Sequence, residues 1–218
     1  NWAIPYVKTP YVIFTDANTM LNKGAIKEII RQFSDPRVGC VAGEKRVEIQ
    51  AEQGATAGEG IYWKYESAFK RLDYRLYSAV GAAGELFAIR TSLFEQMPPD
   101  TLLDDFILSL RIAMKGYKIA YSKEAYALES VSLNMREEEK RKVRISAGGL
   151  QSVWRLRGLL NMFRYGILSF QYISHRVLRW TLTPIILFAL LPLNLLLACT
   201  GHTLYTVTLA LQLAFYLP

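Results

Sequence analysis

The chain has 218 residues, enough for one domain of ordinary size with an appendage, and its 26 Lys and Arg against 19 Asp and Glu give a formal net charge of +7. Its two cysteines and two histidines show no metal-ligand spacing, so a Cys/His metal site is not expected. No nucleic-acid-binding motif accompanies the basic excess, so nucleic acid is not an expected partner.

The first predicted element is a buried strand that ends in polar residues. Tyr11–Phe14 is a short run of strand-forming apolar residues, and Asp16 and Asn18 follow closely behind it. Ligands bind beyond the carboxyl ends of strands in open α/β sheets, so both side chains are candidates for binding a ligand. The alternative is that they only stabilise a turn through bonds to local backbone N–H groups.

Strands and helices then alternate along the chain, which predicts an α/β fold. Helices are predicted where apolar residues recur at helical spacing, over residues 22–33, 60–76 and 104–116. Strands are predicted over residues 38–49 and 79–90, each interrupted by glycine, and over residues 117–122 and 125–130. Asn22 is the expected N-cap of the first helix, and Gly116 is the expected stop of the third.

The C-terminal part of the chain has a different character. Residues 137–178 are basic and aromatic at helical spacing, which predicts amphipathic helices on a membrane surface, with a soluble helical segment as the alternative. Arg179 is the last charged residue, and the uncharged run Trp180–Cys199 is long enough to cross a bilayer. Thr200–His202 breaks this run, and a second apolar segment follows to the end of the chain. The alternative is a pair of buried helices in a soluble core.

Four local motifs stand in order along the chain. They are Asp16-Ala-Asn18, the small-residue loop Gly81–Glu85, the acid pair Asp104 and Asp105 at a predicted helix start, and the basic run Arg141–Gly149. Each alone has a simple structural explanation: a turn, a bulge, a helix cap and a solvated face.

Together, ahead of paired apolar spans, these motifs resemble the membrane-embedded family 2 glycosyltransferases, the group that includes cellulose, hyaluronan and poly-N-acetylglucosamine synthases. The resemblance covers nearly the whole chain. It implies an internal fragment of a longer protein: the C-terminal half of an A-type nucleotide-sugar transferase domain with a mixed sheet and flanking helices (residues 1–136), a basic motif with amphipathic interface helices (137–178), and transmembrane helices of which the second is truncated (179–218).

The resemblance also assigns roles to individual residues. Asp105 falls on the family's general base and Asp104 on the acid before it, and Asp16 and Asn18 fall on the D-x-D motif that binds Mg²⁺ or Mn²⁺. The donor diphosphate is assigned to Lys142 and Arg144, and the acceptor side to Gly81, Gly84, Glu85, Arg141 and Ile145. Three positions depart from the family pattern: Asn18 replaces the second acid, Arg141 a glutamine and Ile145 a tryptophan.

The implied activity is inverting transfer of a sugar from a nucleotide-diphosphate donor, expected to be a UDP-sugar, to a glycan or lipid-linked acceptor in polysaccharide synthesis. Lys and Arg gather ahead of the first apolar span, which predicts an integral protein of the plasma (inner) membrane with a cytoplasmic catalytic domain. The lipid bilayer is therefore an expected partner. The alternatives are transfer of a single sugar to a lipid or other acceptor, and a non-catalytic membrane subunit that keeps the fold.

Overall fold

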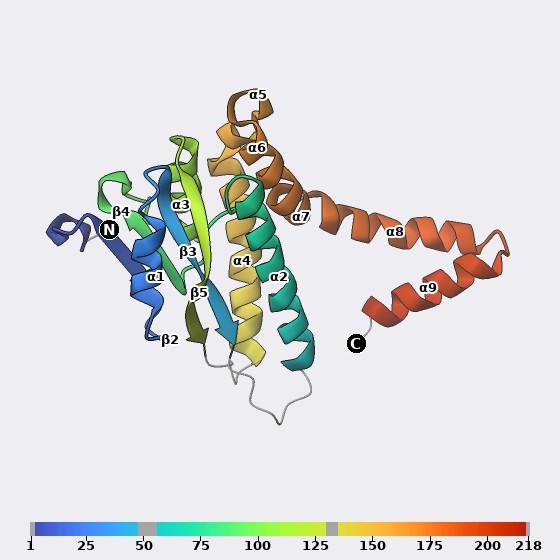
Figure 1. The fold of residues 1–218 in the computed structure, drawn as a ribbon. Helices are drawn as coiled ribbons and strands as arrows, with labels where there is room; N and C mark the ends of the chain where they lie inside the picture. The colour runs from blue at the N-terminus through green and yellow to red at the C-terminus, as the bar shows by residue number, and fades with distance from the viewer. Residues whose placement is uncertain (1–2, 48–55, 130–134, 217–218) are drawn as a thin grey trace. The chain divides into compact units, whose positions relative to one another are not determined.

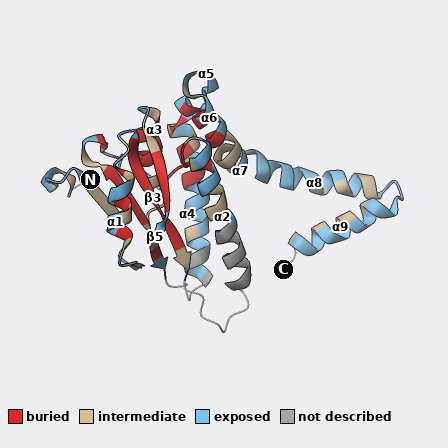
Figure 2. Ribbon diagram, viewed as in Figure 1, coloured by how far each residue is buried: buried red, intermediate tan, exposed pale blue. Residues whose placement is uncertain are grey.

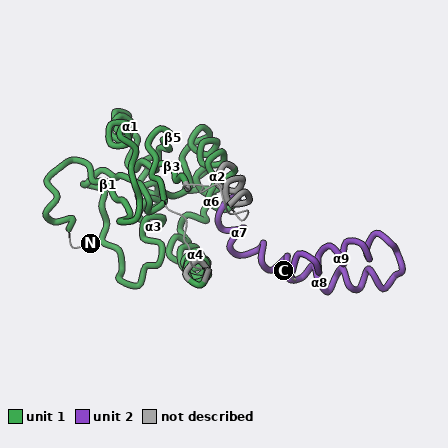
Figure 3. The backbone as a smooth tube through the Cα atoms, turned by 90° about the horizontal axis from the view of Figure 1, so that it is seen from below, with its two compact units in different colours: residues 1–173 green, residues 174–218 purple. Residues whose placement is uncertain are grey.

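The computed structural model describes residues 3–47, 56–129 and 135–216 (Figure 1). The chain forms two compact units, Asn1–Ile173 and Ser174–Pro218 (Figure 3). Most of the predicted interface segment, residues 137–178, therefore belongs to the first unit.

A five-stranded mixed sheet forms the centre of the first unit, as expected for an A-type domain. Its strands, in spatial order, are β1 (Tyr11–Thr15), β4 (Leu86–Arg90), β3 (Val38–Val47), β5 (Lys118–Glu129) and β2 (Thr19–Leu21). β3 and β5 pair in parallel, and the other neighbouring pairs are antiparallel.

Two predicted features of the strands are wrong. The expected strand pair over residues 79–90 is a loop followed by the single strand β4, because residues 79–85 turn away to contact α3 (Asp104–Met114). The two short strands expected over 117–122 and 125–130 are one strand, β5. The charged residues between them lie where its register with β3 shifts, next to Gly43, so the shift absorbs the apparent break without ending the strand.

Helices cover both faces of the sheet. α1 (Ala25–Gln32) packs Ala25 and Ile29 against Val38, Val41 and other buried residues of β3, β4 and β5. α2 (Thr56–Leu76) and α3 lie on the other face. The strands between the helices are the most buried part of the unit (Figure 2).

The ends of the predicted helices agree with the structure in one case and differ in another. α3 stops at Met114, and Gly116 follows with a φ of 94°, as predicted. Asn22 is not the N-cap of α1, whose N-cap is Gly24. The Asn22 side chain instead accepts from the Tyr126 N–H and donates to the Glu124 carbonyl, which joins the end of β2 to β5.

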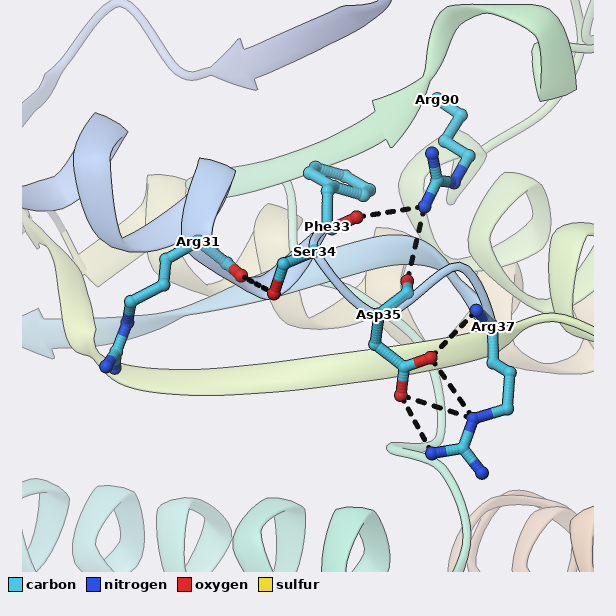
Figure 4. A network of polar contacts seen from close by, with 6 residues as sticks. All are labelled: Arg31, Phe33, Ser34, Asp35, Arg37 and Arg90. Atoms are coloured by element: carbon cyan, nitrogen blue, oxygen red, sulfur yellow. Dashed lines mark hydrogen bonds and ion pairs between the residues drawn. The ribbon is translucent and has the colours of Figure 1, made fainter.

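Arg90 stabilises the turn between α1 and β3 (Figure 4). Its guanidinium donates to the carbonyls of Phe33, Asp35 and Val38 at 3.1, 3.2 and 2.8 Å. Within the same turn, the Asp35 carboxylate accepts from the backbone and side chain of Arg37. The bond to Phe33 satisfies a carbonyl that the end of α1 leaves without a helical partner, and the bonds to Asp35 and Val38 hold the turn that follows.

The rest of the first unit is helical. α4 (Met135–Arg155) is followed by a 3₁₀ turn (Arg157–Leu160), α5 (Met162–Tyr165) and α6 (Ile167–Tyr172). Tyr172 and Gln171 are fully buried, and Gln171 donates to Asp73 of α2 at 2.9 Å. One face of α6 is therefore part of the first unit's core, whereas α5 has no buried residue.

The second unit is a helical hairpin. α7 (Leu178–Trp180) leads into α8 (Leu182–Ala198), and α9 (Thr203–Tyr216) follows the predicted break at Thr200–His202. Asn194 of α8 donates to Gln212 at 2.9 Å and accepts from Thr208 at 3.1 Å, so polar side chains join two apolar helices.

No described helix is by itself both long enough and apolar enough to cross a bilayer. Segments Ile167–Trp180 and Leu182–Ala198 meet these requirements only when taken together as a bent pair. The predicted helix over Trp180–Cys199 is broken at Thr181, where α7 ends.

Candidate active site

The structure brings two of the predicted acidic residues together at Gly84. A Cβ atom added to Gly84 would lie 3.4 Å from Asp105 Oδ2 and 3.7 Å from Asp16 Oδ1. Asp16 follows β1, Asp105 is in the first turn of α3, and Gly84 precedes β4. Three motifs that are far apart in the sequence thus meet in one place, and glycine keeps the space between the two carboxylates open.

Asp105 has an environment that suits an exchangeable proton. Loss of hydration raises the pKa of Asp105 to about 7, and the charges of Asp104 and Glu85 act in the same direction. Hydrogen bonds from the backbone N–H groups of Phe106 and Gly84 oppose this rise in pKa. Asp104 is exposed, and the N-cap of α3 is Leu103, so neither acid is the N-cap residue of this helix.

Gly81 packs against α3 next to this site. It has a φ of 86°, and a Cβ atom there would lie 2.3 Å from the ring of Phe106, the residue after Asp105. The next residue, Ala82, donates its backbone N–H to Ser109 of α3 at 2.9 Å. The predicted acceptor residue Gly81 is therefore buried and fixes the loop to α3.

The turn that carries Asp16 leaves its carboxylate out of the turn's own hydrogen bonds. The backbone carbonyl of Asp16 accepts from the Thr19 hydroxyl at 2.8 Å and from the Thr19 N–H at 3.3 Å. Loss of hydration raises the pKa of the Asp16 carboxyl, and the nearby charges of Glu85 and Glu129 raise it further. A cation bound here would relieve this repulsion.

A cluster of charged residues lies beside Asp16. The ammonium of Lys45 (β3) forms ion pairs with Glu85, at 2.6 Å, and with Glu129 at the end of β5. Arg141 of α4 approaches the same two carboxylates at 3.8 and 4.0 Å. The amide of Asn18 donates to Glu129 at 3.5 Å. Thus Glu85 and Arg141, which were assigned to the acceptor, and Asn18, which was assigned to the metal, are parts of one cluster.

Lys45 and Glu129 are two residues of this cluster that no motif in the sequence indicated. One signal was available for Lys45, a basic residue within a run predicted to be a strand. The pairing of β3 with β5, which places Lys45 beside Glu129, depends on a long-range register that the local sequence does not specify.

α4 carries the remaining predicted residues. Arg144 lies close enough to Asp16 for its charge to lower the pKa of that carboxyl, whereas Lys142 and Ile145 are exposed. One turn further on, Gly148 packs against Leu103, where an added Cβ would lie 2.6 Å from a side-chain carbon. The basic end of α4 is therefore near Asp16, and its next turn lies against the residue before Asp104.

The same helix holds the loop that precedes α3. Gln151 accepts from the Leu102 N–H at 3.0 Å and donates to the Asp100 carbonyl at 2.8 Å. Arg155 donates to the Asp100 carboxylate at 2.6 Å. These bonds fix the chain that leads into Asp105.

The residues at Asp16 fit a divalent cation that is shared with a phosphorylated ligand. Among the described residues, no group of three or more His, Cys, Asp or Glu is arranged to hold a metal ion. Mg²⁺ in nucleotide sites is commonly held by one or two carboxylates together with phosphate oxygens. Asp16, with the amide oxygen of Asn18 as a further oxygen donor, matches that type of site.

Residues 11–218 match the family model described as "Glycosyl transferase family group 2". Two curated proteins are similar: the O-antigen chain rhamnosyltransferase RfbN of Salmonella typhimurium (strain LT2), 28% identical over 138 residues, and the O-antigen chain rhamnosyltransferase WbaN of Salmonella anatum, 28% identical over 142 residues. The matches cover 60% and 62% of this chain but 44% and 45% of the relatives, so the chain spans less than half of their length.

A solved structure shares the fold. It is the mannosyltransferase PcManGT of Pyrobaculum calidifontis in complex with GDP-Man and Mn²⁺, with a TM-score of 0.63 at 19% identity. The match covers 97% of this chain and 61% of that one.

Proposed function

Because the chain belongs to glycosyl transferase family group 2, we propose that it is part of an inverting glycosyltransferase, which moves a sugar from a nucleotide-diphosphate donor to a glycan acceptor. The observation that carries this proposal is the convergence of the Asp16 and Asp105 carboxylates at Gly84. Asp16 lies near the negative charges of Glu85 and Glu129 and suits a cation that binds the donor diphosphate, whereas Asp105 has a pKa near neutrality and suits a general base.

In the proposed reaction, a hydroxyl of the acceptor attacks the anomeric carbon of the donor. The bond from the acceptor oxygen to that carbon forms while the bond to the diphosphate oxygen breaks. The hydroxyl proton passes to Asp105, and the nucleoside diphosphate leaves with the electron pair of the broken bond. A single displacement inverts the anomeric centre, so an α-linked donor gives a β-linked product.

On the donor side, Asp16 and Asn18 would hold Mg²⁺ or Mn²⁺, which when bound offsets the charge of the leaving diphosphate. Arg144 and Lys142 on α4 add positive charge for the same phosphates. The acceptor side is formed by the 81–85 loop, which ends at Glu85, and by the exposed Ile145. Isoleucine lacks an aromatic face for stacking on a sugar, which favours transfer of one or a few sugars over chain growth.

The similar proteins support the class of substrate. Two of them are named as O-antigen chain rhamnosyltransferases, which favours a glycan or lipid-linked acceptor. The PcManGT complex contains GDP-Man and Mn²⁺, which favours a divalent metal in this chain as well. Because its donor is a GDP-sugar, a UDP-sugar is only one of the donor classes to test here. The lengths of the products formed from a panel of donors would distinguish single transfer from polymer synthesis.

We expect sugar transfer by the full-length protein in membrane preparations to fall at least tenfold in EDTA and to recover on addition of Mn²⁺ or Mg²⁺, because Asp16 cannot offset the diphosphate charge without a cation. Asp16→Asn should lower the transfer rate at saturating metal. Asp35→Asn, which removes a carboxylate from the turn between α1 and β3, should leave the transfer rate unchanged. Full activity in EDTA would contradict the metal role, and no transfer from any nucleotide sugar would contradict the proposed function.

We also propose that the second unit enters the membrane as a helical hairpin, with the catalytic unit on the cytoplasmic face of the plasma (inner) membrane. Residues 180–218 contain no charged side chain, and basic residues precede them. The bonds among Asn194, Thr208 and Gln212 support this proposal, because polar side chains in lipid need partners on neighbouring helices.

In a Cys199→Ser background, a cysteine at His202 is expected to react with a membrane-impermeant thiol reagent added to intact cells. The matched control is Ser92→Cys, an exposed position of the first unit that should react only after the cells are permeabilised. Equal labelling of both positions in sealed cells would overturn this topology.

A further inference from the structure

We propose that Lys45 is a positioning residue, which holds the Asp16–Asn18 turn in place for the metal and donor diphosphate; the inference rests on the proposed function of that turn. Lys45 cannot itself reach a substrate easily, because its side chain is only 3% exposed and its ammonium is enclosed by Glu85 and Glu129. Lys45 must therefore act on the turn through Glu85 and Glu129.

Each neighbour of Lys45 connects to one side of the turn. The backbone carbonyl of Glu85 accepts from the hydroxyl of Thr15, the residue before Asp16, at 3.1 Å. The carboxylate of Glu129 accepts from the amide of Asn18, two residues after Asp16, at 3.5 Å. Lys45 thus joins the two groups that bond to the chain immediately before and after the candidate metal ligand.

Strand pairing holds the two ends of the turn, because Thr15 pairs with Leu86 of β4 and Thr19 pairs with Glu129 of β5. Its remaining bonds, from Thr19 to the Asp16 carbonyl and between the hydroxyls of Thr15 and Thr19, are local and exposed. Through the side chains of Glu85 and Glu129, Lys45 adds a buried connection from the turn to β3 in the middle of the sheet. A turn fixed before the donor arrives needs less ordering on binding, which favours affinity.

This arrangement also explains why an amide suits position 18. A carboxylate there would face the negative charge of Glu129 and could not donate a hydrogen bond to it. An amide donates through its nitrogen and keeps its oxygen as an acceptor or metal donor. Asn18 can therefore bond to Glu129 and contribute to a cation site at the same time.

Replacement of Lys45 by methionine should loosen this turn. Two nearly buried carboxylates would lose their shared cation and would repel each other and Asp16. Outer-shell partners of metal ligands typically change metal affinity by about 10–100-fold when they are removed. We therefore expect the affinity for Mn²⁺ with a nucleoside diphosphate to fall at least tenfold.

The test uses the full-length protein and two measurements. The first is calorimetric titration of Mn²⁺ with GDP, UDP or dTDP, using the diphosphate that binds wild type most tightly. The second is hydrogen–deuterium exchange of the segment Asp16–Leu21 without ligand, which should become faster in Lys45→Met than in wild type. Lys27→Met, the same change at an exposed position of α1, is the matched control and should behave as wild type. Lys45→Arg keeps the positive charge and should restore much of both properties.

The outcomes separate the two proposals. If wild type binds none of the metal–diphosphate pairs, the proposed function fails, but exchange of Asp16–Leu21 still tests the role of Lys45. Unchanged exchange of this segment in Lys45→Met would overturn the positioning role. If Lys45→Met does not fold, Asn18→Ala takes its place, because it removes the bond to Glu129 on the exposed side of the cluster; unchanged exchange and affinity in that variant would overturn the inference.

Discussion

Asp105→Asn is expected to lower the rate of sugar transfer by roughly 10²–10⁴-fold, the usual contribution of a general base. The affinity for the donor should change little, because the amide keeps the shape of the side chain and can still accept from the Phe106 N–H. The measurements are the transfer rate and nucleotide affinity in the full-length protein. Asp104→Asn, a change to the exposed neighbour, should have a much smaller effect, and an active Asp105→Asn enzyme would remove the catalytic assignment.

The raised pKa of Asp105 leads to two further expected results, one for the transfer rate and one for stability. The transfer rate of wild type should rise with pH through about 7, as Asp105 loses its proton. The folded pKa is above the unfolded value of 3.8, so the protonated form stabilises the fold, and this stability is lost as pH rises from about 4 through 7. The difference between the two pKa values corresponds to about 4 kcal/mol of folding stability that is lost over this pH range. Asp105→Asn should therefore melt above wild type at pH 8, and the difference should shrink at pH 5.

Gly81→Ala is expected to lower the free energy of unfolding by roughly 2–5 kcal/mol. A side chain at a left-handed φ costs about 1–2 kcal/mol, and forcing a methyl group into a packed site costs about 1–3 kcal/mol. The added carbon would lie 2.3 Å from the ring of Phe106. Transfer should also fall, because Phe106 follows Asp105 directly. Thermal unfolding should show a decrease on the order of 10 °C, at about 2–4 °C per kcal/mol.

Gly116→Ala separates these two contributions. Gly116 has a similar φ of 94°, but an added Cβ would have no atom within 4 Å. This variant should show only the cost of the left-handed backbone, with activity retained. Equal destabilisation by the two substitutions would mean that the contact with Phe106 contributes nothing.

The local sequence was sufficient for some elements. The strand before Asp16 and the helix that stops before Gly116 both depend on neighbouring residues: an apolar run in the first case, and acids at the start and glycine at the end in the second. The break between α8 and α9 at Thr200–His202 is of the same kind. The prediction that the strand before Asp16 is buried is wrong, because β1 lies at the edge of the sheet and is only half-buried. The α/β fold was expected from the alternation of elements and the mixed sheet from the family resemblance, and both are confirmed.

Elements that depend on distant partners were predicted less well. The polar residues within β5 suggested a break, but the strand continues because β3 provides a matching register shift beside Gly43. Asn22 is a good N-cap by residue type, yet two bonds to β5 keep its side chain away from α1. The local sequence shows the residue types of these contacts but not the pairing that joins them.

Some residues of the candidate site could likewise be identified from local sequence, and others could not. Asp16, Gly84 and Asp105 were identified from motifs, and the structure brings them together. Lys45 and Glu129 were missed because each is an ordinary charged residue in its local context, and only the pairing of β3 with β5 makes them neighbours. Glu85 and Arg141 were assigned to the acceptor from their motifs, and the structure adds that they approach each other at 3.8 Å and that Glu85 pairs with Lys45.

The spacing of residues along α4 has a consequence for how the chain can vary in length. Arg144, Gly148, Gln151 and Arg155 are separated by four, three and four residues, which places them on one side of the helix. The first is near Asp16, and the other three contact the loop before Asp105. Each residue of an α-helix advances the chain by about 100° and 1.5 Å, so one inserted residue between Arg144 and Gly148 would rotate the basic end away from Asp16 while the contacts to the loop stayed in place. The two carboxylates thus depend on an unchanged number of residues in this turn of α4, whereas the residues on its exposed side are free to differ.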